Sequence, residues 1–156
     1  MNRASRRIVD VIVIGRPQQK GSKQPVMFKR PGGGVDVVVR DANKRAKPWQ
    51  HAIAAEIAEH RAGEELIRGP VLVTLHFYFV RPRGHYGTGK NANRLRDGAP
   101  SHMIVKPDLD KLERTALDAL TGTALADDCQ VVSMASFKDY GEPERLEIVV
   151  EEIERW

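Results

Sequence analysis

Two pairs of aspartates lie in the segment KPDLDKLERTALDALTGTALADDCQVV, residues 106–132. Asp108 and Asp110 stand at the start of a predicted helix, and Asp127 and Asp128 follow its end. Carboxylates without a cysteine cluster or a histidine pair form the oxygen-rich ligand set that Mg²⁺ or Mn²⁺ prefers. Such an ion polarises a phosphoryl oxygen and helps to deprotonate an attacking water, as phosphodiester hydrolysis requires. One interpretation of the segment is therefore a metal site.

A second interpretation explains the same aspartates structurally. Asp108 can cap the helix, and Asp110 falls in its first turn, where negative charge favours the helix dipole. Asp127 and Asp128 can form a turn before the next strand. A helix of about twelve residues rises about 18 Å, so the pairs meet only if the loop 121–126 and the following strand bring the chain back along the helix. Both interpretations remain open from these residues alone.

The elements around this segment are predicted from hydrophobic periodicity. One strand pattern, PVLVTLHFYFV, places Val71, Val73, Leu75, Phe77 and Phe79 on one face. The run 8–14 is apolar on both faces, which predicts a buried strand, and Trp49 is predicted to be a core residue. We expect strands at 8–14, 35–39, 70–80, 131–138 and 145–153, and helices from about Pro48 to Gly63 and from about Leu109 to Leu120. This order predicts an α+β fold, with a mixed β-sheet backed by two main helices in a single domain over residues 1–156.

A long basic loop, at about 81–106, separates the third strand from the second helix. It contains six basic residues and Asp97 as its one acid, and residues 81–103 show no periodicity. Loops of this length without regular structure are usually functional or disordered. Because DNA is bound first through its backbone charge, we predict DNA-binding residues here and in the basic segment near the N-terminus. These candidates, which could also be solvated surface residues, are Lys20, Lys23, Arg81, Arg83 and Lys106.

The composition is that of a soluble globular protein. The chain has 156 residues, a net charge of +4 and 41% hydrophobic residues. No apolar run approaches the ~20 residues that span a bilayer, so we expect no membrane partner. A single cysteine, Cys129, excludes an intrachain disulfide and a zinc site built from cysteines. We expect the protein to act in a reducing cytoplasm.

The acidic segment resembles the RusA family of Holliday junction resolvases, common in bacteriophages and prophages. KPDLDKLERTALDALTG, ADDCQVV and the later FKDY are similar to the family pattern of D-x-D-N, a DAL helix, DD-x-Q-V and a downstream lysine. GRPQQKGSKQP resembles the family's N-terminal P-x-x-K-G loop, and the resemblance runs from residue 8 to about 150. It implies a RusA-like fold and a homodimeric endonuclease that requires Mg²⁺, with Mn²⁺ as a substitute, and no small-molecule cofactor. Such an enzyme cuts four-way DNA junctions by paired nicks in DNA recombination and repair.

The resemblance also assigns roles to residues. The family's essential aspartates, which are also its metal ligands, correspond to Asp108, Asp110 and Asp128. Asp127 is a further ligand candidate. Lys138 matches the downstream lysine of the family and is a DNA-binding candidate.

Two positions depart from the family pattern. Lys111 stands where the family has asparagine, and Arg114 stands where it has a functional lysine. Both are catalytic candidates, and Lys111 is the better proton donor because arginine does not release its proton. Arg114 could instead pair with Asp118, four residues further along the helix.

Two other functions are compatible with parts of the sequence. The D-x-D pattern also opens the haloacid dehalogenase phosphatase motif, but that motif needs an apolar strand before it and a threonine or valine after it. Pro107 and Lys111 disagree with both requirements. The departures at Lys111 and Arg114 favour a junction-binding protein with impaired catalysis. We expect an enzyme, because carboxylates repel phosphate and would weaken a protein that only binds DNA.

Overall fold

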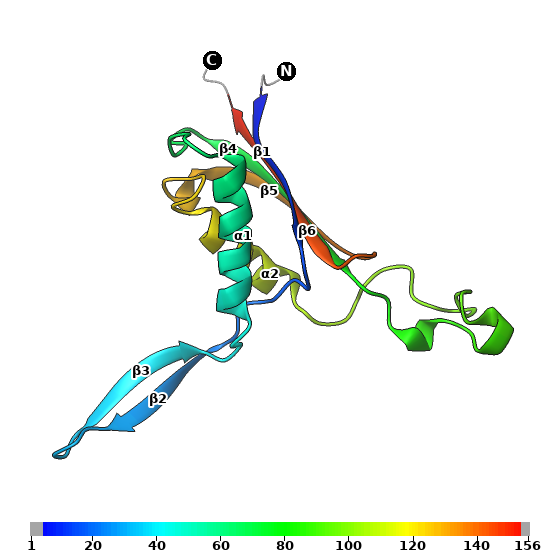
Figure 1. Cartoon of the computed structure of the whole chain (residues 1–156), viewed down its shortest axis with the longest axis horizontal. Coiled ribbons are helices and arrows are strands. Elements are labelled where there is room, and N and C mark those ends of the chain that lie inside the picture. The colour runs from blue at the N-terminus through cyan, green and yellow to red at the C-terminus, as the bar shows by residue number, and fades with distance from the viewer. Residues whose placement is uncertain (1–4, 154–156) are drawn as a thin grey trace.

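The central element of the fold is a four-stranded mixed β-sheet. The computed structural model describes residues 5–153, and Figure 1 shows both helices on one face of the sheet. The sheet has the strand order β1-β6-β4-β5, in which β4 and β5 are parallel and the other neighbours are antiparallel. The predicted α+β fold is thereby confirmed. Its elements are β1 (Ser5–Ile14), β2 (Lys23–Lys29), β3 (Val35–Asp41), α1 (Ala46–His60), β4 (Val71–Phe79), α2 (Leu109–Leu120), β5 (Val131–Tyr140) and β6 (Arg145–Ile153).

The core lies between the sheet and the two helices. The β4 residues from Val71 to Phe79 alternate as predicted, with the five odd-numbered side chains buried towards the helices. Trp49, Ile53 and Ile57 of α1 pack into the same core, which confirms the prediction for Trp49. Burying one such side chain stabilises the fold by about 1.5–3 kcal/mol.

The prediction of a fully buried first strand is wrong. β1 lies at one edge of the sheet, and its side chains at Val9, Val11 and Val13 face the helices. Ile12 and Ile14 point to the opposite face and are 53% and 63% exposed. The helices cover only one face of the sheet. The apolar residues on both faces of β1 therefore did not indicate that both faces are buried.

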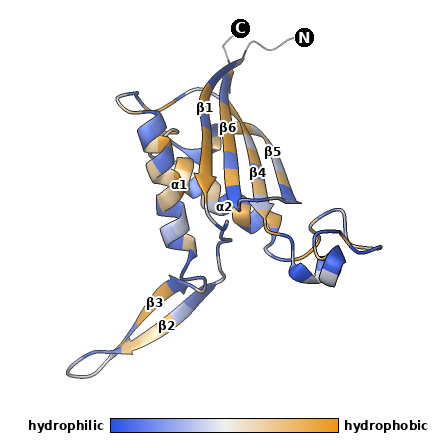
Figure 2. Cartoon of the chain, turned by 45° about the vertical axis from the view of Figure 1, so that its right-hand side comes forward, coloured by the Kyte–Doolittle hydropathy of each residue, from blue (hydrophilic) through white to orange (hydrophobic). Residues whose placement is uncertain are grey.

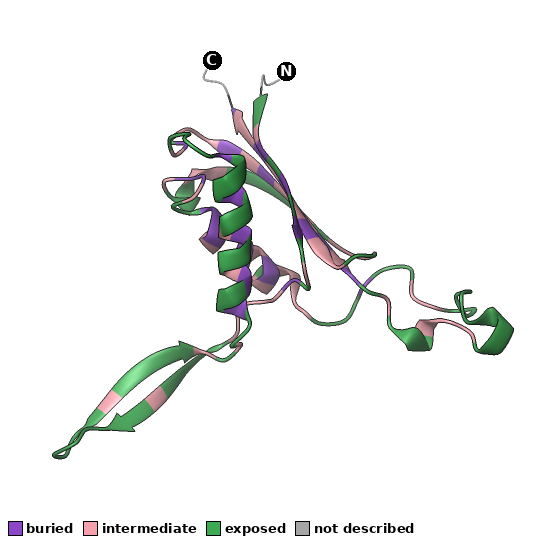
Figure 3. Ribbon diagram, viewed as in Figure 1, coloured by how far each residue is buried: buried purple, intermediate pink, exposed green. Residues whose placement is uncertain are grey.

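Strands β2 and β3 form a separate hairpin that projects from the body of the protein (Figure 1). Met27, Val37 and Val39 lie on one face of the hairpin and are exposed. Figure 3 shows the hairpin as almost entirely exposed, and Figure 2 shows apolar residues along both strands. The sequence predicted β3 but not β2, because Lys23, Pro25 and Lys29 interrupt the apolar pattern of a strand.

The long basic loop projects from the body in another direction than the hairpin, towards the right in Figure 1. Two short 3₁₀ turns, η1 (Arg83–His85) and η2 (Gly89–Asn91), and backbone hydrogen bonds between its two halves order it. Arg81 anchors its base by donating to the Pro100 carbonyl at 2.6 Å and lying 4.2 Å above the Tyr140 ring. Among the described helices, neither length nor apolar content suffices for a membrane span.

Candidate active site at the start of helix α2

Asp108 occupies the N-cap position of α2, but its side chain does not cap the helix. Its carboxylate accepts a hydrogen bond from the Lys111 Nζ at 2.9 Å, and the Asp108 backbone N–H donates to the Gln19 Oε1 at 2.7 Å. The side chain of Asp108 remains 39% exposed. The capping interpretation is therefore wrong for Asp108, whose carboxylate stays accessible beside a lysine.

The Asp108–Lys111 pair fixes the charge of both groups. The hydrogen bond from Lys111 lowers the pKa of Asp108, and the charges of Lys111, Lys106 and Lys138 lower it further. The same bond raises the pKa of Lys111. A lysine with a raised pKa is a weaker proton donor, and the general acid role of Lys111 stays a prediction.

The Lys111→Ala substitution should raise the pKa of Asp108 towards its ordinary value, because it removes the largest cause of the depression. A depressed carboxylate pKa adds stability that is present above the unfolded-state value and is lost as the pH falls through the folded-state value. The ion pair is therefore intact at neutral pH and breaks in acid. A carboxyl-carbon NMR titration of both proteins measures the shift, and an unchanged Asp108 pKa would contradict the pairing.

Asp110 and Arg114 lie in the first and second turns of α2 and are both exposed. In the described part of the chain neither residue forms a salt bridge. The carboxylate of Asp118 accepts its hydrogen bond from the Lys20 Nζ. The alternative pairing of Arg114 with Asp118 is therefore wrong, because a residue distant in sequence takes that carboxylate.

A basic cavity of about 720 Å³ lies between α2 and the base of the β2–β3 hairpin. It brings the catalytic candidates Lys111 and Arg114 together with the DNA-binding candidates Lys20 and Lys23, and it adds Arg40, which the sequence did not single out. Positive charge exceeds negative charge around this cavity, so it suits a phosphate backbone. Its lining residues are Lys20, Gly21, Ser22, Lys23, Val39, Arg40, Asp41, Lys111, Arg114 and Asp118.

The loop before β2 is held against both α2 and the end of β3 by hydrogen bonds from its backbone. The Lys20 N–H donates to the Lys111 carbonyl at 3.1 Å, and the Gly21 N–H donates to the Asp41 Oδ1 at 2.8 Å. A Cβ at Gly21 would collide with the Asp41 carboxylate and the Asn43 backbone, so only glycine fits this approach. Gln19, Asp41 and Asn43 were not predicted as site residues, and the K-G pair in the loop was the one available signal.

Lys138 anchors the segment that leads into α2. Its Nζ donates to the carbonyls of Val105 and Pro107, both at 2.8 Å. Lys138 thus positions the chain just before Asp108, and its predicted contact with DNA stays a prediction. Lys106 lies in the anchored segment and is exposed, so its ammonium is accessible to a ligand.

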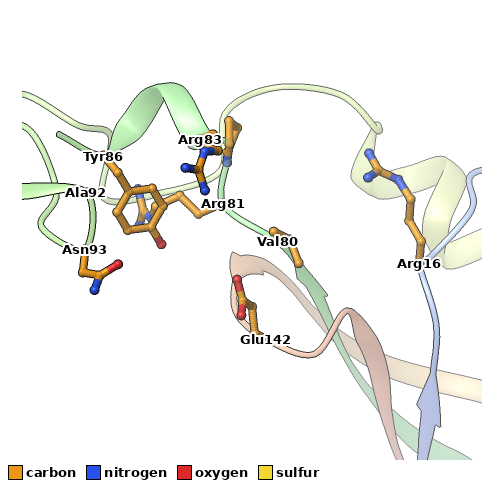
Figure 4. Close-up of a pocket in the computed structure, with 9 residues that line it drawn as sticks. Arg16, Val80, Arg81, Arg83, Tyr86, Ala92, Asn93 and Glu142 are labelled. Atoms are coloured by element: carbon orange, nitrogen blue, oxygen red, sulfur yellow. The ribbon is translucent and has the colours of Figure 1, made fainter. Parts of the chain in front are cut away.

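Arg81 and Arg83 line a second basic cavity, of about 640 Å³, at the base of the long loop. Figure 4 shows both arginines and Tyr86 on one side, with Glu142 across from them and Arg16 further along. Two of the predicted DNA-binding residues therefore lie apart from the cavity beside α2.

Asp127 and Asp128 lie beyond the other end of α2, at the 3₁₀ turn η3 (Asp128–Gln130) that precedes β5. The Asp127 carboxylate accepts from the Cys129 N–H at 2.9 Å, which lowers the pKa of Asp127, and the Asp127 N–H donates to the Gln130 Oε1 at 2.8 Å. The turn-forming interpretation is confirmed for Asp127. Asp128 is exposed, and in this turn the capping carboxylate is that of Asp127 and not that of Asp128.

A single chain does not gather the four carboxylates. The two pairs flank a helix of 12 residues, which rises about 18 Å. β5 then runs back along α2, so that Lys138, near the end of the strand, reaches the residues before Asp108, whereas Asp128 precedes the start of the strand. Over residues 5–153, no three His, Cys, Asp or Glu side chains are close enough to hold a metal ion. The condition under which the two pairs would meet is therefore not fulfilled within residues 5–153 of one chain, and the assignment of these four aspartates as metal ligands stays a prediction.

Comparison with known proteins identifies the family. Residues 18–151 match the family Endodeoxyribonuclease RusA. The "Uncharacterized protein YqaN" of Bacillus subtilis (strain 168) is 30% identical over 133 residues, which cover 83% of this chain and 92% of that protein. The chain belongs to the RusA family of endodeoxyribonucleases. RusA proteins are nucleases that resolve Holliday junctions and are metal-dependent in general; the resemblance seen in the sequence is confirmed.

Proposed function

We propose that this protein is an endonuclease that resolves four-way DNA junctions by paired phosphodiester hydrolysis, with Mg²⁺ as cofactor and Mn²⁺ as a substitute. It would act in DNA recombination and repair in the cytoplasm of a bacterium or a phage-infected host. One observation carries the proposal: the half-buried Asp108 carboxylate contacts Lys111, which lines the basic cavity together with Arg114, and the exposed Asp110 carboxylate lies in the same turn of α2. Cations attract the phosphate backbone to this place, and the carboxylates supply hard oxygen donors at the same end of α2.

The two basic cavities support branched DNA as the substrate. The start of α2 lies between the β2–β3 hairpin and the long basic loop (Figure 1). A duplex arm bound by Lys20, Lys23 and Arg40 would meet the cavity on the hairpin side, and another strand would meet Arg81 and Arg83 on the loop side. Each phosphate contact releases counterions, so binding should weaken steeply with salt.

We infer a homodimer from the family resemblance and from the symmetry of the substrate. A four-way junction needs two symmetric cuts, and two copies related by a two-fold axis can supply one cut each. One chain offers Asp108 and Asp110 at the start of α2 and Asp127 and Asp128 beyond its end, so the proposed metal ligands are divided within each copy.

A gel assay with synthetic four-way, forked and linear duplexes tests this function. We expect cleavage of the four-way junction into nicked linear duplexes with Mg²⁺ or Mn²⁺, binding without cleavage in EDTA, and little cleavage of linear duplex. Junction binding without cleavage under any of these conditions would favour the impaired binding protein. Equal cleavage of the linear duplex would contradict junction selectivity.

A further inference from the structure

The cavity of about 640 Å³ at the base of the long loop carries opposite charges that do not pair with each other. Figure 4 shows Arg83 and Tyr86 on the side of the loop, with Glu142 across the opening. Over residues 5–153, neither the Arg83 guanidinium nor the Glu142 carboxylate makes a salt bridge or a side-chain hydrogen bond. A guanidinium only donates and an ionised carboxylate only accepts. A complementary ligand therefore carries an anionic group at one end and a hydrogen-bond donor at the other.

The two other arginines that line this cavity are already engaged by the fold. Arg16 forms a salt bridge with Glu144 at 3.2 Å. Arg81 lies over the Tyr140 ring, 4.2 Å from its centroid. Both arginines help to keep the wall of the cavity in place, whereas Arg83 is exposed and its guanidinium can bind a ligand.

Tyr86 is held in the wall of the cavity by the loop itself. Its backbone N–H donates to the Arg83 carbonyl at 3.1 Å, and its carbonyl accepts from the Arg96 Nε at 2.8 Å. Tyr86 is half-buried in this position. An aromatic ring next to a cation is the arrangement by which proteins bind single-stranded nucleic acid, because a base stacks on the ring and the cation attracts the phosphate.

We propose that this cavity is a subsite for one unpaired nucleotide of a DNA strand. In this subsite Tyr86 stacks on the base, Arg83 holds the phosphate, and Glu142 accepts a hydrogen bond from an exocyclic amino group of the base. The volume lies within the range of about 300–1,000 Å³ that holds one small ligand, so it fits one nucleotide and not a duplex arm. A base in a duplex is paired and stacked, so the bound nucleotide has to leave the stack. The choice of a DNA strand over a free nucleotide rests on the proposed function.

The Glu142 carboxylate determines which bases fit the subsite. Cytosine presents an amino group where thymine and uracil present a carbonyl oxygen, which repels a carboxylate. Adenine and guanine also carry an amino group. The subsite should therefore select against thymine and uracil, and it would make cleavage sensitive to the base at one position of the junction.

Fluorescence anisotropy with short single strands tests the subsite in EDTA, where no cleavage occurs. Oligo(dC) should bind about ten-fold more tightly than oligo(dU), because the two bases differ at the edge that faces Glu142. Glu142→Gln should remove most of this preference, since an amide donates to a carbonyl as well as accepting from an amino group. Equal binding of both strands by the wild type, or a preference that Glu142→Gln retains, overturns the proposal.

Variants of Tyr86 test the stacking separately from the recognition of the base edge. Tyr86→Leu should weaken the binding of oligo(dC) and oligo(dU) alike, by about ten-fold. Tyr86→Phe should restore most of the loss, because stacking needs the ring and not the hydroxyl. Wild-type affinity in Tyr86→Leu would contradict the stacking.

A pair of loop variants tests the phosphate contact. Arg83→Ala should weaken binding and reduce the dependence of log K on log salt by about 0.7, the value for one phosphate contact to a single strand. Lys90→Ala is the matched control, because Lys90 is exposed in the same loop and does not line the cavity. It should keep the preference for oligo(dC). Loss of that preference in Lys90→Ala would place base recognition outside the cavity and overturn the proposal.

Photocrosslinking locates the bound base and identifies its source. A single strand with 5-iododeoxycytidine should crosslink to Tyr86, which peptide mass spectrometry detects. Crosslinking to Phe28 of the hairpin in place of Tyr86 would overturn the assignment. Deoxycytidine monophosphate should compete with oligo(dC) only at a more than about 100-fold higher concentration, because it lacks the neighbouring phosphates. Competition at equal concentration would make a free nucleotide the ligand and overturn the assignment to a DNA strand.

Cleavage assays separate the subsite from the proposed function. Four-way junctions are varied between cytosine and uracil at each position around the crossover, and the wild-type rate should differ at one of them. Glu142→Gln should reduce this difference. Cleavage that is insensitive to Glu142→Gln at every position overturns the subsite and leaves the nuclease standing. Absence of cleavage, together with binding of oligo(dC) that depends on Glu142, refutes the proposed function and leaves the subsite standing.

Discussion

Asp110→Asn should abolish Mg²⁺-dependent cleavage of a synthetic four-way junction, by roughly 10³-fold or more, while junction binding stays intact or becomes tighter. The carboxylate of Asp110 is exposed at the start of α2 and holds no salt bridge in the described structure, so the fold does not depend on it. Removing one member of a catalytic group that acts as a unit costs factors of this size. Loss of one negative charge beside the cavity also lowers the repulsion of phosphate.

Single-turnover cleavage and gel-shift titrations on the same junction measure these two effects. Glu113→Gln is the matched control, since it removes one carboxylate from the same helix, and it should cleave like the wild type. Thermal unfolding should be nearly the same for all three proteins. If Asp110→Asn cleaves at the wild-type rate, Asp110 has no role in the reaction.

Lys111→Ala should slow cleavage by about 10²-fold, the loss typical of removing one electrostatic stabiliser from a site. Lys111 lies 2.9 Å from the Asp108 carboxylate and lines the cavity next to Arg114. Its removal therefore changes both the charge environment of the Asp108 carboxylate and the positive charge of the cavity. Arg114→Ala removes a cation one turn further from Asp108 and should have a smaller effect.

The comparison of the two variants decides which cation acts at the scissile phosphate. Single-turnover rates at saturating protein separate slower cleavage from weaker binding. Lys111→Arg should recover part of the lost rate, because it restores the charge without the geometry of an ammonium. Equal and small losses in Lys111→Ala and Arg114→Ala would place neither cation at the reacting group.

The sequence predicted the central elements because each carries a strong pattern. α2 begins and ends at the predicted residues, since Leu112, Ala116 and Leu120 form a clear stripe that packs on the sheet. β4 was predicted with both of its faces. β2 was not predicted because it packs against no core and so needs no alternating apolar pattern. Ile12 and Ile14 are exposed because the helices cover only the other face of the sheet, which the sequence of the strand does not show.

The candidate site could be predicted only in part for a similar reason. The residue types and spacing of Asp108 and Lys111 indicated their chemistry. The hydrogen bond between their side chains, which takes the place of a cap on α2 by the Asp108 carboxylate, could not be predicted in the same way. Contacts between distant segments, such as Gln19 with Asp108 and Lys20 with Asp118, leave no periodic signal in the chain. The sequence predicted the helix between Asp110 and Asp128, but it did not determine whether the chain beyond the helix returns to Asp110.

The exposed β2–β3 hairpin is expected to unfold at a lower free energy than the sheet and the two helices. A two-stranded hairpin with no core behind it is marginally stable on its own, so it can open locally while the sheet and both helices stay folded. Val39, Arg40 and Asp41 at the base of β3 form one wall of the basic cavity, and α2 forms the other. The wall from α2 keeps its place with the core, and Asp41 is tied to the loop before β2 by the Gly21 N–H. Local opening of the hairpin would therefore change the cavity mainly at Val39 and Arg40.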